Sequence, residues 1–122
     1  MTNPQRAAPD SGLRFSSLQR LTEASDYRGL LSQRASSDDY FRVVVRPNAL
    51  GYGRLGLTVS RRTAARAVDR NRIKRLIRES FRSAQNQIAG NDVLVMARRQ
   101  AVSASNKTLR HSLEQRWRLM DN

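Results

Sequence analysis

The chain has 122 residues, enough for one small domain with a modest core and too few for two. Its 23 lysines and arginines against 10 aspartates and glutamates give a net charge of +13, which internal pairing cannot neutralise, so a partner must supply negative charge. Cysteine is absent, which excludes disulfides and thiolate metal sites, and no apolar run approaches the roughly 20 residues that span a bilayer.

The chain begins with a polar stretch, Met1 to Gly12, that lacks the apolar segment of a signal peptide. Its proline, serine and glycine content predicts a disordered tail, followed by a single domain over residues 13–122. The absence of cysteine and of a targeting segment favours a cytoplasmic setting. Thr22 is suited to cap a short helix that is expected to end near Ser32.

Two strands are expected next. Residues Tyr40 to Val45 have the β-branched density of a strand, and Pro47 marks its end. A loop with two glycines leads to a second strand, Leu55 to Ser60, and the two strands are predicted to pair as a hairpin. Alternation along the first strand separates one face with Phe41, Val43 and Val45 from another with Tyr40, Arg42 and Val44. The second face combines an aromatic, a cation and a small apolar residue, which suits contact with nucleotides.

An amphipathic helix is predicted from about Ala65 to Gln87, with Thr63 as its cap and Gly90 just past its end. At about 100° per residue its side chains separate into an apolar arc and a polar arc. The apolar arc contains Ile73, Leu76, Ile77, Ser80, Phe81, Ala84 and Ile88. The polar arc contains Asn71, Arg72, Lys74, Arg75, Arg78 and Arg82.

The charge on and around this helix is unusually one-sided. Over residues 54–82, ten lysines and arginines face only two carboxylates, Asp69 and Glu79, whereas solvated helix faces usually mix the two signs. Arg61 and Arg62 extend the patch ahead of the helix. A patch of this kind fits the phosphates of RNA or DNA, and the preference for arginine over lysine favours nucleic acid, because a guanidinium can bind phosphate with two hydrogen bonds.

Asp92 to Arg98 is expected to be a third strand with a nearly continuous apolar centre. A final helix follows, with Ser103 or Ser105 as its cap. Its apolar residues recur at the spacing of a helix that lies against a sheet: Leu109, Leu113, Trp117 and Met120. The order of elements predicts an α+β fold in which helices cover one face of a small, mainly antiparallel sheet and leave the other face open.

The sequence offers little for chemistry of its own. His111, the single histidine, has no metal-ligand partner at a suitable spacing and is predicted to lie at the surface. Asp38 and Asp39 precede a strand and are expected to close a turn rather than to act as an acid and base pair. No catalytic residue and no bound metal are therefore predicted for this chain alone.

A family resemblance is carried by two segments. Residues 56–62, Gly-Leu-Thr-Val-Ser-Arg-Arg, and residues 70–79, Arg-Asn-Arg-Ile-Lys-Arg-Leu-Ile-Arg-Glu, closely resemble the signature of bacterial ribonuclease P protein subunits. The resemblance extends from about Leu13 to Met120. It implies the element order α-β-β-(β)-α-β-α, a short extra strand near Arg34 to Ser37 that the residues themselves do not indicate, and a left-handed strand-helix-strand crossover.

The resemblance implies that the chain is the protein subunit of ribonuclease P, an endonuclease that removes the 5′ leader from precursor tRNA. In that family the catalytic centre belongs to the RNA subunit, which holds most of the metal ions, usually Mg²⁺. This chain would then bind no metal and would not be catalytic alone. The implied partners are ribonuclease P RNA and precursor tRNA, without a membrane or an obligate protein partner.

The resemblance also assigns roles to matched positions. Contacts with the catalytic RNA are implied for Arg61, Arg62, Arg66, Arg70, Asn71, Arg72, Lys74, Arg75 and Arg78. A cleft between the first helix and the open sheet face would receive the leader, with Tyr27, Leu31, Arg42 and Val44 as its contacts. Arg14 and Arg20, just ahead of Tyr27, are further candidates for gripping a single strand. Tyr27 is the leading candidate, because the family often has aromatics where this chain has Leu31 and Val44.

Two other classes of function would use some of the same features. A structural RNA-binding protein, such as a ribosomal component, would use the basic helix but would need no open cleft for a single strand. A self-contained nuclease would need carboxylate or histidine ligands that this sequence scarcely offers.

Overall fold

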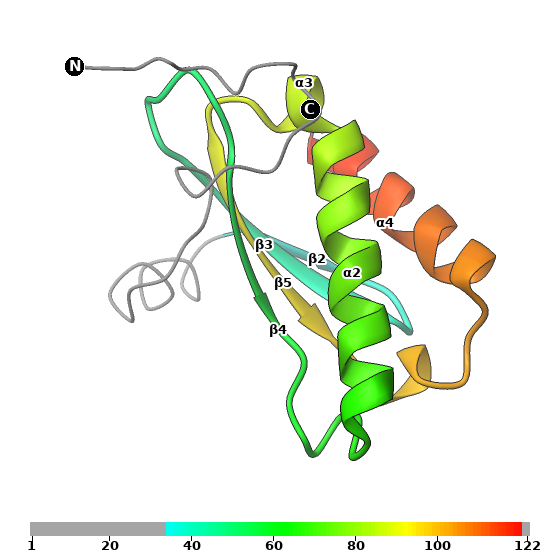
Figure 1. Ribbon diagram of the computed structural model, residues 1–122. Coiled ribbons are helices and arrows are strands. Elements are labelled where there is room, and N and C mark those ends of the chain that lie inside the picture. The colour runs from blue at the N-terminus through cyan, green and yellow to red at the C-terminus, as the bar shows by residue number, and fades with distance from the viewer. Residues whose placement is uncertain (1–33, 121–122) are drawn as a thin grey trace.

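The computed structural model describes residues 34–120, in which two long helices, α2 and α4, pack on a four-stranded sheet (Figure 1). In chain order the elements are β2 (Arg34–Ser37), β3 (Phe41–Pro47), β4 (Arg54–Thr58), α2 (Ala67–Ser83), α3 (Gln85–Ile88), β5 (Asn91–Ala97), the 3₁₀ helix η2 (Arg99–Ala101) and α4 (Asn106–Met120). The expected tail and the helix predicted from Thr22 to Ser32 lie outside the described residues. Among residues 34–120, no helix has the length and apolar character needed to cross a bilayer.

The strands follow the order β2-β3-β5-β4 across the sheet. β3 pairs antiparallel with β2 and with β5, whereas β4 pairs parallel with β5. The predicted hairpin of the first two expected strands is therefore wrong, because β5 lies between β3 and β4. β5 is suited to this central place since Val93, Leu94 and Val95 are at most 2% exposed, so both of its faces are covered.

The extra strand that the family resemblance implied is present as β2. It precedes β3, and its register sets Ser36 opposite Val43. The described order is therefore β-β-β-α-β-α, with the extra strand first rather than after the two longer strands. The α+β class is confirmed, and the sheet is mixed, with its antiparallel pairs on one side and its parallel pair on the other.

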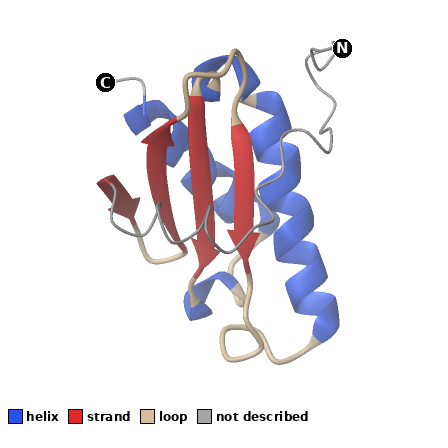
Figure 2. Cartoon of the chain, turned by 90° about the vertical axis from the view of Figure 1, so that its left-hand side faces the viewer, coloured by secondary structure: helices blue, strands red, loops and turns tan. Residues whose placement is uncertain are grey.

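The main core lies between the sheet and the two long helices, which cover the same face of the sheet (Figure 2). The predicted apolar stripes are confirmed for the members that are buried together: Ile73, Leu76, Ile77 and Phe81 from α2, and Leu109, Leu113 and Trp117 from α4. The side chain of Met120, the last predicted member, lies outside the described part of the structure. Ser80 also faces α4, where its Oγ accepts a hydrogen bond from Trp117 Nε1 at 2.7 Å. The polar side of α2 is consequently turned away from the core.

The basic helix is shorter than the sequence suggested. Arg66 rather than Thr63 occupies the N-cap, without a side-chain capping bond. Thr63 instead belongs to a turn in which its N–H donates to Ser60 Oγ at 3.1 Å, so the chain turns once more before α2 begins. At Ala84 the backbone leaves helical geometry, with φ −105° and ψ 18°, and the short α3 follows.

Of the two other predicted helix boundaries, Gly90 follows the short α3 rather than the basic helix, and the cap of α4 is confirmed. Gly90, just after α3, has φ 84°, a left-handed conformation that glycine adopts without a steric penalty. Ser105 caps α4, since its Oγ accepts the N–H of Thr108 at 3.1 Å, which decides between the two serines that the sequence offered.

Candidate nucleic-acid interface

The outward side of α2 and the segment ahead of it carry the cations that the sequence singled out. On α2, Asn71 and Arg75 are exposed, and Lys74 and Arg78 are half-buried. The segment between β4 and α2 adds three exposed arginines, Arg61, Arg62 and Arg66. Because the opposite side of α2 is fixed in the core, the side chains on α2 project from a rigid support.

Arg70 differs from its neighbours because it turns back along its own chain. Its Nη1 donates to the carbonyl oxygens of Ala64 and Ala65, at 3.0 and 2.8 Å. Arg70 thereby holds the turn that leads into α2, a role that its place on the polar arc did not reveal.

Arg72 joins α2 to the segment that precedes α4. Its Nη1 donates to Asn106 Oδ1 at 2.7 Å and to the carbonyl of Ala104 at 3.3 Å. Its Nη2 donates to the carbonyls of Val102 and Ala101, at 3.0 and 3.4 Å. These bonds can take up every N–H group on the two terminal nitrogens. The sequence could not indicate this role, because the acceptors lie 29 to 34 residues further along the chain.

The sheet face opposite the helices holds the described leader candidates. Arg42 is exposed there, whereas Val44 is buried against Leu94. Tyr40, which was predicted to share this face, instead precedes β3 and packs against the main core. The remaining leader candidates lie outside the described residues: Arg14, Arg20, Tyr27 and Leu31.

The displacement of Tyr40 has a local cause in Asp38. Its Oδ1 accepts the backbone N–H groups of Tyr40 and Phe41, at 2.8 and 2.9 Å, so regular strand alternation begins only at Phe41. This bond pattern confirms the turn predicted at Asp38. Asp38 Oδ2 also accepts a hydrogen bond from Ser112 Oγ of α4 and lies 4.0 Å from Arg116 Nε.

Burial raises the pKa of Asp38, but its hydrogen bonds with Ser112, Phe41 and Tyr40 outweigh that effect and hold the pKa below the ordinary value. Asp38 is therefore ionised over a wider pH range than a free aspartate. His111, which neighbours Ser112, is exposed as predicted.

A buried carboxylate, Asp92, organises one end of the sheet face opposite the helices, and it was not predicted from the sequence. Asp92 is 0% exposed and lies opposite Arg46 of β3 and Arg54 of β4 in the sheet register. Its Oδ2 accepts from Nη2 of both arginines, at 2.7 and 2.8 Å. Its Oδ1 accepts from Arg54 Nε at 2.7 Å and from Asn48 Nδ2 at 2.9 Å.

Burial raises the pKa of Asp92, but hydrogen bonds from Arg54, Arg46 and Asn48 more than compensate and hold the pKa below its ordinary value. The ionised carboxylate fixes two guanidinium groups side by side on the sheet. One signal in the sequence could have pointed to it: an aspartate that opens an apolar strand needs cationic partners from neighbouring strands.

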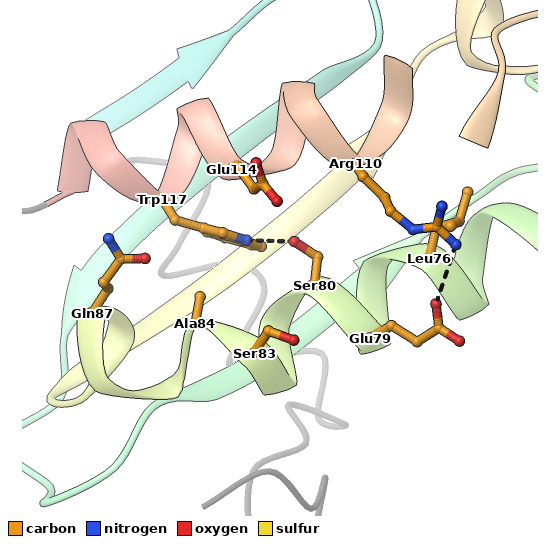
Figure 3. Close-up of a pocket in the computed structure, with 9 residues that line it drawn as sticks. All are labelled: Leu76, Glu79, Ser80, Ser83, Ala84, Gln87, Arg110, Glu114 and Trp117. Atoms are coloured by element: carbon orange, nitrogen blue, oxygen red, sulfur yellow. Dashed lines mark hydrogen bonds and ion pairs between the residues drawn. The ribbon is translucent and has the colours of Figure 1, made fainter. Parts of the chain in front are cut away.

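A groove of about 320 Å³ lies between α2 and α4 (Figure 3). Trp117 and Ala84 lie in it beside polar side chains of both helices. At its rim Arg110 Nη2 is 4.0 Å from Glu79 Oε1. In the described part of the chain, no group of three or more histidine, aspartate or glutamate side chains is placed to hold a metal ion.

Comparisons with known proteins point in one direction. A family model described as "Ribonuclease P" matches residues 15–121. The ribonuclease P protein component of Methylococcus capsulatus is 42% identical over 117 residues, which cover 95% of this chain and 91% of that protein.

Solved structures are similar in fold. The RNase P protein of Staphylococcus aureus gives a TM-score of 0.77 at 29% identity, with 83% of this chain and 94% of that chain covered. The RNase P protein of Thermotoga maritima gives a TM-score of 0.71 at 30% identity, with 84% and 94% covered.

Proposed function

The chain belongs to the bacterial ribonuclease P protein family, which gives it a role in tRNA 5′ maturation, and on this premise we propose that its basic helix docks on the catalytic RNA of ribonuclease P. The observation that carries the proposal is the outward side of α2, where cations stand on a helix that the core holds rigid. Rigid cations lose little conformational freedom when they meet phosphates, so they bind a folded RNA more effectively than a mobile tail.

Two kinds of arginine have different parts in this proposal. Arg75, exposed at the middle of α2, would contact phosphate directly, together with Arg61, Arg62, Arg66, Asn71, Lys74 and Arg78. Arg70 and Arg72 would contribute mainly by holding the segment before α2 and the segment before α4, because their guanidinium groups already donate to carbonyls. Any contact that they make with RNA would add to that role.

We propose that the leader of precursor tRNA is received on the sheet face opposite the helices. The exposed Arg42 on β3 supports this placement, as a cation that could meet the leader's phosphates. Val44 is buried beside its cross-strand neighbour Leu94, so it would have to become exposed before it could touch the leader. The other proposed contacts, Arg14, Arg20, Tyr27 and Leu31, lie outside the described residues.

In this proposal the RNA subunit, and not the protein, holds the catalytic centre and its Mg²⁺. In this arrangement the protein lowers the repulsion between phosphates of the two RNAs, so that the RNA binds Mg²⁺ and substrate at lower metal concentration. Ribonuclease P RNA and precursor tRNA are the partners, and the cytoplasm is the compartment, since both RNAs are made there.

A left-handed crossover belongs to the same proposal. β4 and β5 are parallel neighbours joined through α2. Figure 2 views the sheet from the face opposite the helices, and there both strands run downward with β4, the edge strand, on the right. A chain that passes behind the sheet and returns on the left turns in the left-handed sense. This arrangement is rare among strand-helix-strand units.

Reconstitution tests the proposal. Ribonuclease P RNA from the same organism would cleave precursor tRNA at low Mg²⁺, with and without the protein, using substrates with long and very short leaders. We expect a gain in rate that shrinks for the short leader, because fewer leader phosphates remain to be bound. The Arg75→Gln variant should lose much of the gain, whereas Arg118→Gln, an exposed charge at the far end of α4, should keep it.

The alternatives predict different results. No gain on either substrate would leave a general RNA binder, and tight binding to ribosomal RNA with none to ribonuclease P RNA would favour a ribosomal role. RNA degradation by the purified protein alone, abolished by a point substitution, would support a self-contained nuclease.

A further inference from the structure

A second row of positive charge lies outside the residues assigned above. Arg98 and Arg99 at η2 and Lys107 and Arg110 at the start of α4 are all exposed, and we call these four residues the second basic row. From residue 93 to residue 113 the sequence has no aspartate or glutamate. Ordinary solvated surfaces intersperse both signs of charge, so an unbalanced stretch of this length indicates an anionic partner.

The second basic row is held beside α2 by specific contacts. Arg72 fastens residues 101–106 to α2 through its bonds to the carbonyls of Val102 and Ala104 and to Asn106 Oδ1. Further along the two helices, Arg110 Nη2 of α4 lies 4.0 Å from Glu79 Oε1 of α2. Figure 1 shows α4 lying beside α2, with η2 near the beginning of both helices. The row therefore has a fixed position relative to the cations of α2.

The backbone under the second basic row is also restrained. The N–H of Arg98 donates to the carbonyl of Tyr40 at 2.8 Å, which ties the start of η2 to the sheet. Ser105 caps α4 just before Lys107. The first-turn amides of α4 and its dipole favour negative charge near Lys107, as a minor addition to the side chains.

Resting on the function proposed above, we propose that the second basic row binds phosphates of a further segment of ribonuclease P RNA. The protein would then grip the RNA along two fixed rows, one on α2 and one on η2 and α4. Arg110 is a weaker member, because Glu79 partly offsets its charge, and Arg99 and Lys107 represent the two parts of the row in the test. Glu114, one turn beyond Arg110 on α4, marks the end of the row.

The test measures the affinity of the full chain for ribonuclease P RNA between 50 and 400 mM KCl at fixed Mg²⁺. Three variants, Arg99→Gln, Lys107→Gln and Arg118→Gln, each remove one exposed positive charge. Arg118 is the matched control, since it lies on α4 about 16 Å from Lys107 along the helix axis. Arg75→Gln reports on the proposed function itself. Urea unfolding followed by Trp117 fluorescence checks that each variant is folded.

We expect Arg99→Gln and Lys107→Gln each to weaken binding about fivefold near 150 mM salt and to reduce the slope of log affinity against log salt by about 0.7 to 0.9. Arg118→Gln should change neither. If Arg75→Gln weakens binding but both row variants behave like Arg118→Gln, the inference is overturned and the proposed function stands. If Arg75→Gln binds like the unsubstituted chain, the proposed function fails, and the inference with it.

Discussion

Asp92 accepts hydrogen bonds from Arg46, Arg54 and Asn48 while having no exposed surface, so removing its charge takes away the carboxylate that the two guanidinium groups share. We expect Asp92→Asn to lower the free energy of unfolding by about 3 kcal/mol, since breaking a buried pair strands the remaining charge. Urea unfolding measures the change. Asp69→Asn is the control, because Asp69 meets Arg66 only at 3.9 Å on the surface and should cost at most about 0.5 kcal/mol. Equal effects of the two substitutions would contradict this account.

The lowered pKa values of Asp92 and Asp38 also predict an acid limit to stability. Between each lowered pKa and the ordinary value of 3.8, the unfolded chain binds more protons than the folded chain, so stability rises with pH. The contribution is complete above the ordinary value and is lost as the pH falls through the folded value. The urea midpoint should therefore be flat near neutral pH and fall below about pH 4. Asp92→Asn should flatten that fall, and an unchanged fall would show that other carboxylates cause it.

Residue-scale roles were predictable from the sequence where they depend on exposure and charge. The outward position of Arg75 and the surface position of His111 followed from helical spacing and from the lack of partners. The inward bonds of Arg72 and Asp92 did not, since their partners come from distant segments that only the fold brings together. The predicted position of Tyr40 on the face with Arg42 was wrong for a local reason. Asp38 accepts the backbone N–H of Tyr40, so the regular alternation of the strand begins only after it.

At the scale of elements, Arg72 is the link between α2 and the segment before α4. A lysine could not reach four acceptors in two directions, so Arg72→Lys should lower the free energy of unfolding by about 1 to 3 kcal/mol. Arg75→Lys, at an exposed position on the same helix, should change it by less than about 0.5 kcal/mol. Trp117, the single tryptophan, lies between α2 and α4 and reports the unfolding. If both substitutions are equally mild, Arg72 does not hold the segment.

The helices and strands themselves were largely predictable, but the pairing of the strands was not. Apolar periodicity located α2, β5 and α4 within a few residues of their observed bounds. It could not show that β5 separates β3 from β4, because hairpin pairing and insertion of a later strand demand the same alternation. The continuous apolar run of β5, typical of a central strand with both faces covered, was the available signal.

For the whole molecule, the surplus of positive charge predicts opposite effects of salt on the free protein and on its RNA complex. The net charge is +13, and the ion pairs Arg66–Asp69 and Arg110–Glu79 are long and exposed, so salt screens more repulsion than attraction. In the complex the same ions compete with the protein for phosphate. With six to ten phosphate contacts, affinity should fall about 10³- to 10⁵-fold between 50 and 200 mM salt.

The opposite effects of salt on stability and on RNA affinity can be tested by measuring both quantities on the same protein. Urea midpoints of the free protein at 50 and 300 mM KCl, followed by Trp117 fluorescence, should rise with salt, while the affinity for ribonuclease P RNA falls over the same range. In Arg75→Gln the urea midpoint should rise less with salt and the affinity for RNA should fall less steeply. The substitution removes one positive charge that both repels other cations in the free protein and attracts phosphate in the complex. A urea midpoint that falls with salt would mean that attractive ion pairs outweigh the repulsion. The cations would then be paired within the protein, and this would contradict a surface of unneutralised positive charge that binds RNA.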